Sequence, residues 1–244
     1  MTKLRVVGLS FLLLAFTAFG NAGAFDKVVY GEDDRLDIFE TTNPLFIDIA
    51  RSTAAMIERS SLTDSGENVV ISGDTLEQRG ICASAKFAKQ ITAAMCSGFL
   101  VGKDLLVTAG HCIRTQADCD TYSWVFDYNH ATPEKTEFSV PKSSVYRCKK
   151  VISQTLDRAT MNDFSLIRLE RVVTDREPLN YRKEGKIETN HPVVVIGHPT
   201  GLPTKVAAGA NVRSNDNAYY FVSNLDTFGG NSGSAVFDAL TGSV

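Results

Sequence analysis

The sequence lacks the features that define several large classes of protein. Beyond the first 24 residues, no apolar run approaches the roughly 20 residues that a membrane-spanning helix needs. No two cysteines are spaced as C-x-x-C and the four histidines show no ligand spacing, so we predict neither a metal nor a cofactor. The formal net charge is only −3 over 244 residues, which gives no reason to expect a nucleic-acid partner.

The N-terminus has the pattern of a secretory signal peptide. Lys3 and Arg5 precede an apolar run of 14 residues, Val6–Phe19, and the small residues Ala22–Ala24 form a cleavage pattern. An uncleaved anchor is the alternative, although the run is short for crossing a bilayer. We predict a signal peptide at 1–24, cleavage after Ala24 and a secreted or periplasmic monomer with no membrane association.

Residues 25–80 differ in character from the rest of the chain. Apolar residues recur at helical spacing from a plausible start at Asn43-Pro44 through Ala54 and Ile57. The polar stretch that follows contains one short predicted strand, Val69–Ile71. Two interpretations are open, namely a pro-segment that is removed and an N-terminal extension that packs on the main body.

From residue 81 the pattern is one of short strands separated by turns. Many short strands with few long helical patterns favour antiparallel barrels or a sandwich. A polar run at 177–190 could link two such units, so we predict an all-β protein with one unit at 81–180 and another at 181–244. The predicted strands are 95–101, 105–108, 122–128, 145–151, 164–169, 193–197, 205–212, 219–222 and 235–237.

Three residues have settings suited to nucleophilic catalysis. A serine hydroxyl needs a base to take its proton, and the base needs a carboxylate to hold its tautomer and orientation. A buried strand leads directly onto His111 through small residues, and Asp163 stands at the start of an alternating apolar strand. Ser232 lies in a glycine-rich turn and supplies a candidate nucleophile. Taken singly, each has an ordinary alternative: a structural histidine, a loop-capping aspartate and a turn between strands.

Glycines flank the candidate nucleophile on both sides. Gly230 and Gly233 allow a tight backbone turn that would direct the N–H groups of Gly230 and Ser232 into one spot. Two such donors form an oxyanion hole, which stabilises the charge that develops on a carbonyl oxygen. A phosphate-binding loop is excluded, because no lysine follows and no long helix is indicated.

The segments Thr108–Cys112, Asp163–Ile167 and Gly229–Ser234 together resemble the chymotrypsin-fold serine proteases. Within these, the chain looks most like the secreted bacterial branch that includes the glutamyl endopeptidases. The resemblance covers about residues 90–240. It implies two six-stranded antiparallel β-barrels that meet at the active site, a trypsin-like serine endopeptidase activity through an acyl-enzyme, and protein or peptide substrates.

The resemblance also implies the roles of individual residues. His111 is expected to be the general base, Asp163 its orienting carboxylate and Ser232 the nucleophile, with a disulfide between Cys96 and Cys112 bracing the histidine loop. In the trypsin branch an aspartate precedes the serine and receives a freed N-terminal amine during activation. Here Asn231 stands at that position and cannot form the ion pair.

Substrate preference is left open by two neighbouring residues. Asp226 lies six residues before the serine, at the base of the specificity pocket in this fold, and would favour arginine or lysine by charge pairing. Thr227 matches a threonine that glutamyl endopeptidases use to recognise acidic residues. A third interpretation is that Asp226 simply faces solvent.

The sequence ends twelve residues after Ser232, so we expect the second barrel to be incomplete. Five cysteines cannot all pair within one chain. We therefore expect Cys148 to pair outside these residues, leaving Cys82 and Cys119 as a second bridge. The alternatives to an active peptidase are a truncated inactive product and a non-catalytic homologue that acts as a binding or adhesion module.

Overall fold

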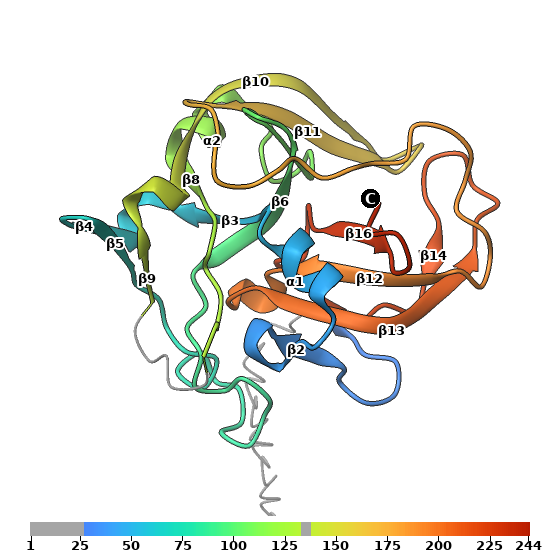
Figure 1. Cartoon of the computed structure of the whole chain (residues 1–244), viewed down its shortest axis with the longest axis horizontal. Coiled ribbons are helices and arrows are strands. Elements are labelled where there is room, and N and C mark those ends of the chain that lie inside the picture. Colours follow the sequence, from blue (N-terminus) through green and yellow to red (C-terminus); the bar gives the residue numbers. More distant parts are fainter. Residues whose placement is uncertain (1–26, 133–137) are drawn as a thin grey trace, which may run out of the picture.

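The computed structural model describes residues 27–132 and 138–244, so the predicted signal peptide falls outside the described residues. Within these two ranges strands dominate, and the two α-helices are short (Figure 1). The elements are β1 (Lys27–Val28), β2 (Arg35–Asp37), α1 (Pro44–Ala50), β3 (Thr53–Glu58), β4 (Leu62–Ser65), β5 (Asn68–Ile71), β6 (Ala94–Gly102), β7 (Leu105–Thr108), α2 (Gln116–Thr121), β8 (Tyr122–Val125), β9 (Ser139–Pro141), β10 (Val145–Asp157), β11 (Asn162–Leu169), β12 (Pro192–Gly197), β13 (Lys205–Ser214), β14 (Val222–Ser223), β15 (Thr227–Phe228) and β16 (Ala235–Asp238).

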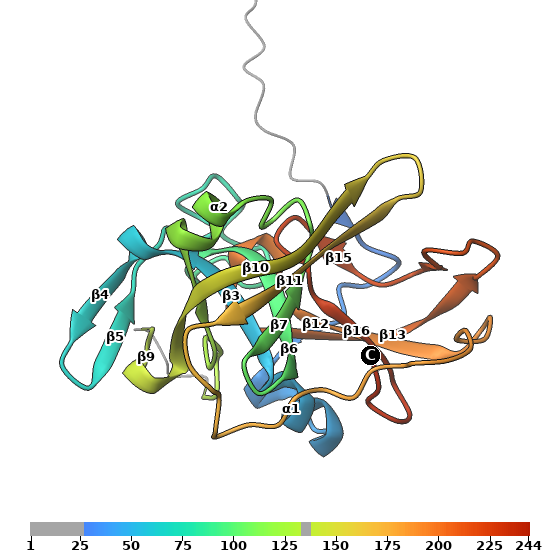
Figure 2. The same ribbon diagram turned by 90° about the horizontal axis from the view of Figure 1, so that it is seen from above.

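Six antiparallel strands close into a barrel in the order β10-β11-β7-β6-β3-β8. The alternation of β11 buries Ile167 and Leu169, and Trp124 fills the centre of the barrel with no exposed surface. Gly98 on β6 makes room for that ring, because a Cβ there would lie 2.6 Å from Trp124 Cζ3. Figure 2 shows the long hairpin of β10 and β11 extending beyond the barrel.

The second half of the molecule is an open sheet. Its strands follow the order β14-β13-β12-β16, and β2 from the N-terminal part adds to β13. Phe46 and Ile49 of α1 pack with Val194, Ile196 and Phe237 in a single core under this sheet. The structure therefore confirms the predicted all-β class, with one closed six-stranded barrel and an incomplete second one.

The described residues of 27–80 contribute strands to both halves of the molecule. β2 joins the second sheet, whereas β3 is one of the six strands of the closed barrel. Because a barrel without one strand would expose two edges, removal of the whole segment would open it. The described part of this segment is thus built into the main body.

The predicted helix begins where expected but is shorter. The side chain of Asn43 accepts a hydrogen bond from Leu45 N at 3.0 Å, which caps α1. Ala54 and Ile57 lie instead in β3, so the prediction that the helix continues through them was wrong. β3 packs against one core through Ala54 and against another through Ile57, and a strand buried on both faces shows no alternation.

Candidate active site

His111 is placed by the turn that follows β7. A Cβ on Gly110 would lie 2.0 Å from Thr155 O and 2.9 Å from Phe164 O, so only glycine lets this turn pack against the β10–β11 hairpin. That packing brings His111 to Asp163, the second residue of β11. The candidate base and carboxylate are therefore held by neighbouring strands of one barrel.

Asp163 contacts His111 through both carboxylate oxygens. Its Oδ1 accepts the backbone N–H of His111 at 2.9 Å, and its Oδ2 lies 2.6 Å from His111 Nδ1. The first bond fixes the backbone, and the second favours the tautomer that carries its proton on Nδ1. Nε2 is then the basic nitrogen. The imidazole is 38% exposed, so this nitrogen can be reached by a substrate.

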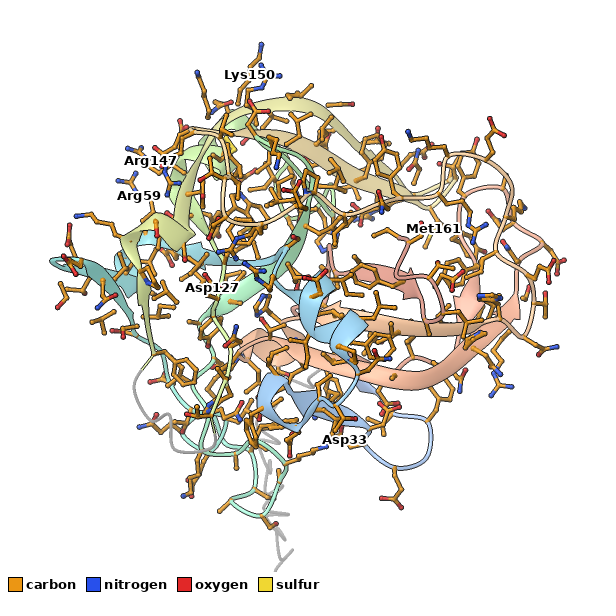
Figure 3. All side chains as sticks on the ribbon, viewed as in Figure 1. Asp33, Arg59, Asp127, Arg147, Lys150 and Met161 are labelled. Carbon is orange, nitrogen blue, oxygen red and sulfur yellow. A yellow bond between two sulfur atoms is a disulfide. The ribbon has the colours of Figure 1, made fainter. Side chains whose placement is uncertain are left out.

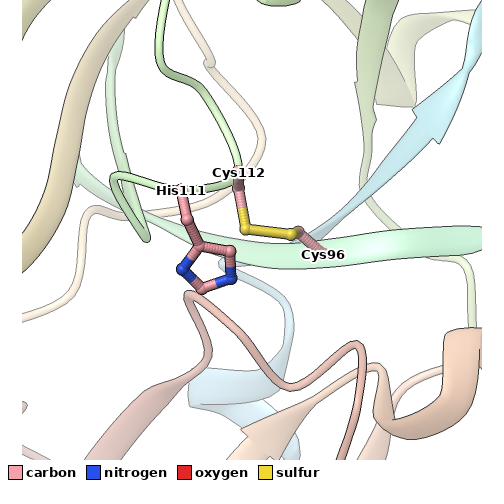
Figure 4. A group of neighbouring side chains, drawn as sticks. All are labelled: Cys96, His111 and Cys112. Carbon is pink, nitrogen blue, oxygen red and sulfur yellow. A yellow bond between two sulfur atoms is a disulfide. The ribbon is translucent and has the colours of Figure 1, made fainter. Parts of the chain in front are cut away.

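A disulfide between Cys96 and Cys112 lies beside the imidazole (Figure 4). It joins β6 to the residue that follows His111, as the resemblance implied. The two sulfurs and a ring nitrogen of His111 lie within 4.8 Å of one another, so by distance alone these three atoms could ligate one metal ion. Because the sulfurs are bonded to each other, neither is available as a thiolate. The cluster is therefore a brace for the histidine loop.

The turn that carries Ser232 is packed against the same strand ends. The carbonyl of Ser232 accepts a hydrogen bond from Ser97 N at 2.8 Å and lies 3.8 Å from Cys112 Sγ. Gly233 has φ +82, and a Cβ there would lie 2.2 Å from Ser97 O and 2.4 Å from Thr108 Oγ1. The close approach requires glycine at this position, and it brings the Ser232 turn beside the His111 loop.

Among the described residues, the turn that carries Ser232 has two backbone N–H groups without a bonded acceptor, those of Gly230 and Ser232. The carbonyl of Gly229 accepts from Thr200 N at 2.5 Å, and the carbonyl of Asn231 accepts from Ser234 N at 2.8 Å. In a trans peptide the N–H points opposite to the C=O. The N–H groups of Gly230 and Ser232 therefore point away from those partners, and neither donates to an acceptor among the described residues.

Ser97 is a supporting residue that sequence reasoning missed. Its hydroxyl donates to Gly230 O at 2.9 Å and accepts from His198 N at 2.9 Å, so it links the Ser232 turn to the loop after β12. His198 is fully buried, stacks on Tyr128 and has a pKa lowered by burial to about 3. A serine in a β-strand carries no local signal for this role, because its partners lie more than 100 residues away.

Asp226 is buried and faces the N-terminal segment. Its side chain accepts from Tyr30 N at 2.8 Å through Oδ1 and from Asp34 N at 3.3 Å through Oδ2, and the residue is only 4% exposed. The interpretation that Asp226 faces solvent was therefore wrong. Thr227 follows in β15, which pairs with β1. Burial, together with the neighbouring Asp226 carboxylate, raises the pKa of Asp34 to about 6.

The remaining cysteines pair differently from the expectation. Cys119 of α2 is bonded to Cys148 of β10, with Cα atoms 5.2 Å apart, and Cys82 is an exposed free thiol. The expected Cys82–Cys119 bridge and the external partner for Cys148 were wrong. α2 begins at the Thr115 cap and packs directly on β10, which brings Cys119 within bonding distance of Cys148.

Comparison with models of protein families identifies the family to which this chain belongs. Residues 96–244 match the family model of the trypsin-like peptidase domain, so the chain belongs to the trypsin-like peptidases. The predicted family is confirmed, and with it a protease fold. A comparison with curated protein sequences found no match.

Solved structures support the fold. A Glu endopeptidase is 18% identical over 89% of this chain and 85% of its own, with a TM-score of 0.50. A serine endoprotease from Yersinia pestis is 13% identical over 82% of this chain and 54% of its own, with the same score of 0.50. At these identities the likeness shows the fold alone. Among the described residues, no helix is long and apolar enough to cross a membrane.

Proposed function

We propose that the protein is an exported serine endopeptidase that cleaves peptide bonds through an acyl-enzyme. The observation that carries this proposal is the two-point contact between Asp163 and His111, next to the turn that holds Ser232. A carboxylate that only capped a loop would bond to the backbone N–H alone. The additional bond to Nδ1 orients the ring, as a general base requires.

In the proposed reaction, His111 Nε2 takes the proton of the Ser232 hydroxyl while its Oγ attacks the substrate carbonyl carbon. The carbonyl electron pair moves onto oxygen, and the N–H groups of Gly230 and Ser232 stabilise that negative charge. When the oxyanion collapses, the C–N bond breaks and the leaving amine takes the proton from His111. Water, activated by His111, then hydrolyses the acyl-enzyme, and Asp163 stabilises the imidazolium in both halves.

We further propose that Asp226 anchors the N-terminal segment rather than selecting a basic residue by charge pairing. Both carboxylate oxygens already accept backbone N–H groups, from Tyr30 and Asp34. Acidic specificity remains a second candidate, on the basis of Thr227 and the fold shared with a Glu endopeptidase. Peptide substrates with Arg, Glu or Leu at the cleaved position distinguish the cases. Asp226→Asn should lower the rate of cleavage of all three substrates by the same factor. A selective loss of cleavage after Arg would instead restore the charge-pairing interpretation.

Export is proposed from the apolar run of residues 6–19 and the two disulfides, which persist in oxidising compartments. N-terminal sequencing of protein recovered outside the cytoplasm should begin at Phe25. Recovery of the intact N-terminus in a membrane fraction would instead support an uncleaved anchor.

A fluorophosphonate probe tests the nucleophile, because it labels only an activated serine. The wild-type protein should be labelled and Ser232→Ala should not. Ser234→Ala is the matched control: it removes a hydroxyl two residues away and should leave labelling in place. Asp163→Asn should lower the labelling rate by three to four orders of magnitude, about the loss seen when a triad carboxylate is replaced. A folded wild-type protein that is never labelled would support the non-catalytic binding module.

A further inference from the structure

The first barrel carries a hollow whose lining includes none of the residues assigned to the reaction. Its volume is about 740 Å³, and it lies between the β4–β5 hairpin and the start of β10. Three arginines line it, and we call it the arginine groove after Arg59, Arg147 and Arg171. Figure 3 shows Arg59 and Arg147 on the same side of the molecule.

The arginine groove is more positive than the rest of the chain. Its lining holds the three arginines and Lys142 against two carboxylates, whereas the whole chain has a net charge of −3. Of the carboxylates, Asp64 pairs with Lys142, and Glu170 accepts the backbone N–H of Arg147 at 3.0 Å. Among the described residues, none of the three guanidinium groups forms an ion pair with a carboxylate.

Two of the guanidinium groups are held in place before any ligand arrives. Arg171 stacks on the ring of Tyr146 at 3.6 Å, and its Nη2 donates to Ser143 O at 2.9 Å and to Val145 O at 2.8 Å. Arg59 Nη1 donates to a backbone carbonyl in α2 at 3.3 Å. Each guanidinium has five donors, so most remain for a ligand. Fixed arginines lose little side-chain freedom on binding, which favours affinity.

The arginine groove also has apolar walls. Leu62 and Val145 are half-buried in its lining, next to the buried Val69. Arginine binds carboxylates in a bidentate geometry, and apolar walls accept aliphatic or aromatic side chains. Both chemistries occur together in an acidic peptide, whereas a sulfated polysaccharide supplies only the anions. We propose that the arginine groove binds an acidic, partly apolar peptide segment of a partner protein, outside the site of peptide cleavage.

The test uses the full-length Ser232→Ala protein, so that no probe is cleaved. The probe is a fluorescent decapeptide of alternating Glu and Leu, followed by fluorescence anisotropy at low salt. Arg147→Gln should weaken binding about tenfold, as expected for the loss of one charge-assisted bidentate contact. Arg213→Gln is the matched control, because it removes the same charge from an exposed position on β13 in the second half of the molecule.

Four results would overturn the proposal. The first is that the probe fails to bind, and the second is that a Gln–Leu peptide binds as tightly as the Glu–Leu probe. The third is that Arg213→Gln weakens binding as much as Arg147→Gln. The fourth is that a fluorescent heparin decasaccharide binds, and loses affinity in Arg147→Gln, while the acidic peptide shows no such dependence on Arg147, which would assign the arginine groove to a polysaccharide. Thermal melting of Arg147→Gln should match the parent protein, because this exposed side chain has no described ion-pair partner. Support also requires that binding weaken with added salt.

Discussion

Removal of the Cys119–Cys148 disulfide should destabilise the protein by an amount set by the loop that it closes. The two cysteines are separated by 29 residues. The chain-entropy relation gives about 3.6 kcal/mol for a loop of this length at 25 °C. In a protein of this size, 1 kcal/mol shifts the melting temperature by about 2–4 °C, so Cys119→Ala/Cys148→Ala should melt about 7–14 °C lower.

Differential scanning calorimetry under oxidising conditions measures this shift, and Cys82→Ala is the matched control. Cys82 is exposed and unpaired, so its substitution should leave the melting temperature unchanged. The reasoning is refuted if Cys82→Ala lowers the melting temperature as much as the double variant. It is also refuted if non-reducing peptide mapping joins Cys82 to Cys119. Either result would restore the pairing expected from the sequence.

Two further predictions concern the turn at His111 and the N-terminal segment. Gly110→Ala should abolish peptidase activity and lower the melting temperature, because the new Cβ would lie 2.0 Å from Thr155 O; activity at the wild-type level would contradict this packing. Asp34→Asn should stabilise the protein at pH 7 but not at pH 4, because a carboxyl with a folded pKa of about 6, above its ordinary value of 3.8, contributes stability that is lost as pH rises through 6. Asp33→Asn is the control of opposite sign. Burial raises the pKa of Asp33, but the hydrogen bonds and the charge of Arg35 outweigh this effect, so the net pKa lies below its ordinary value. This variant should therefore lose stability at pH 7 and approach the stability of the wild type in acid. Melting curves from pH 4 to 8 that show both variants changing in the same direction would contradict the assignment.

The elements of the fold that could be predicted are those whose structure is determined by residues close to one another in the sequence. Each of the ten predicted strands overlaps a strand of the structure, because alternating apolar residues and turn residues act over a few positions. The cap at Asn43 was visible for the same reason. β3 was not predicted as a strand, since burial against two cores removes the alternation on which such predictions depend.

The same distinction holds at the candidate site. His111, Asp163 and the Ser232 turn carry local signals, and the structure brings their loops together. The role of Ser97 and the partners of Asp226 had no local signal, because the contacts join residues far apart in the chain; Tyr30 and Asp226 are separated by 196 positions.

The candidate base, carboxylate and nucleophile were thus predictable from short motifs, since His111, Asp163 and the glycine-flanked Ser232 each stand out by only a few adjacent residues. Two outcomes required the folded chain. Cys119 pairs with Cys148 because α2 packs on β10, and Asp226 turns toward the N-terminal segment because β1 pairs with β15. Composition and spacing do not encode which of several distant partners a side chain meets. Strand pairing and core packing determine which distant residues come into contact.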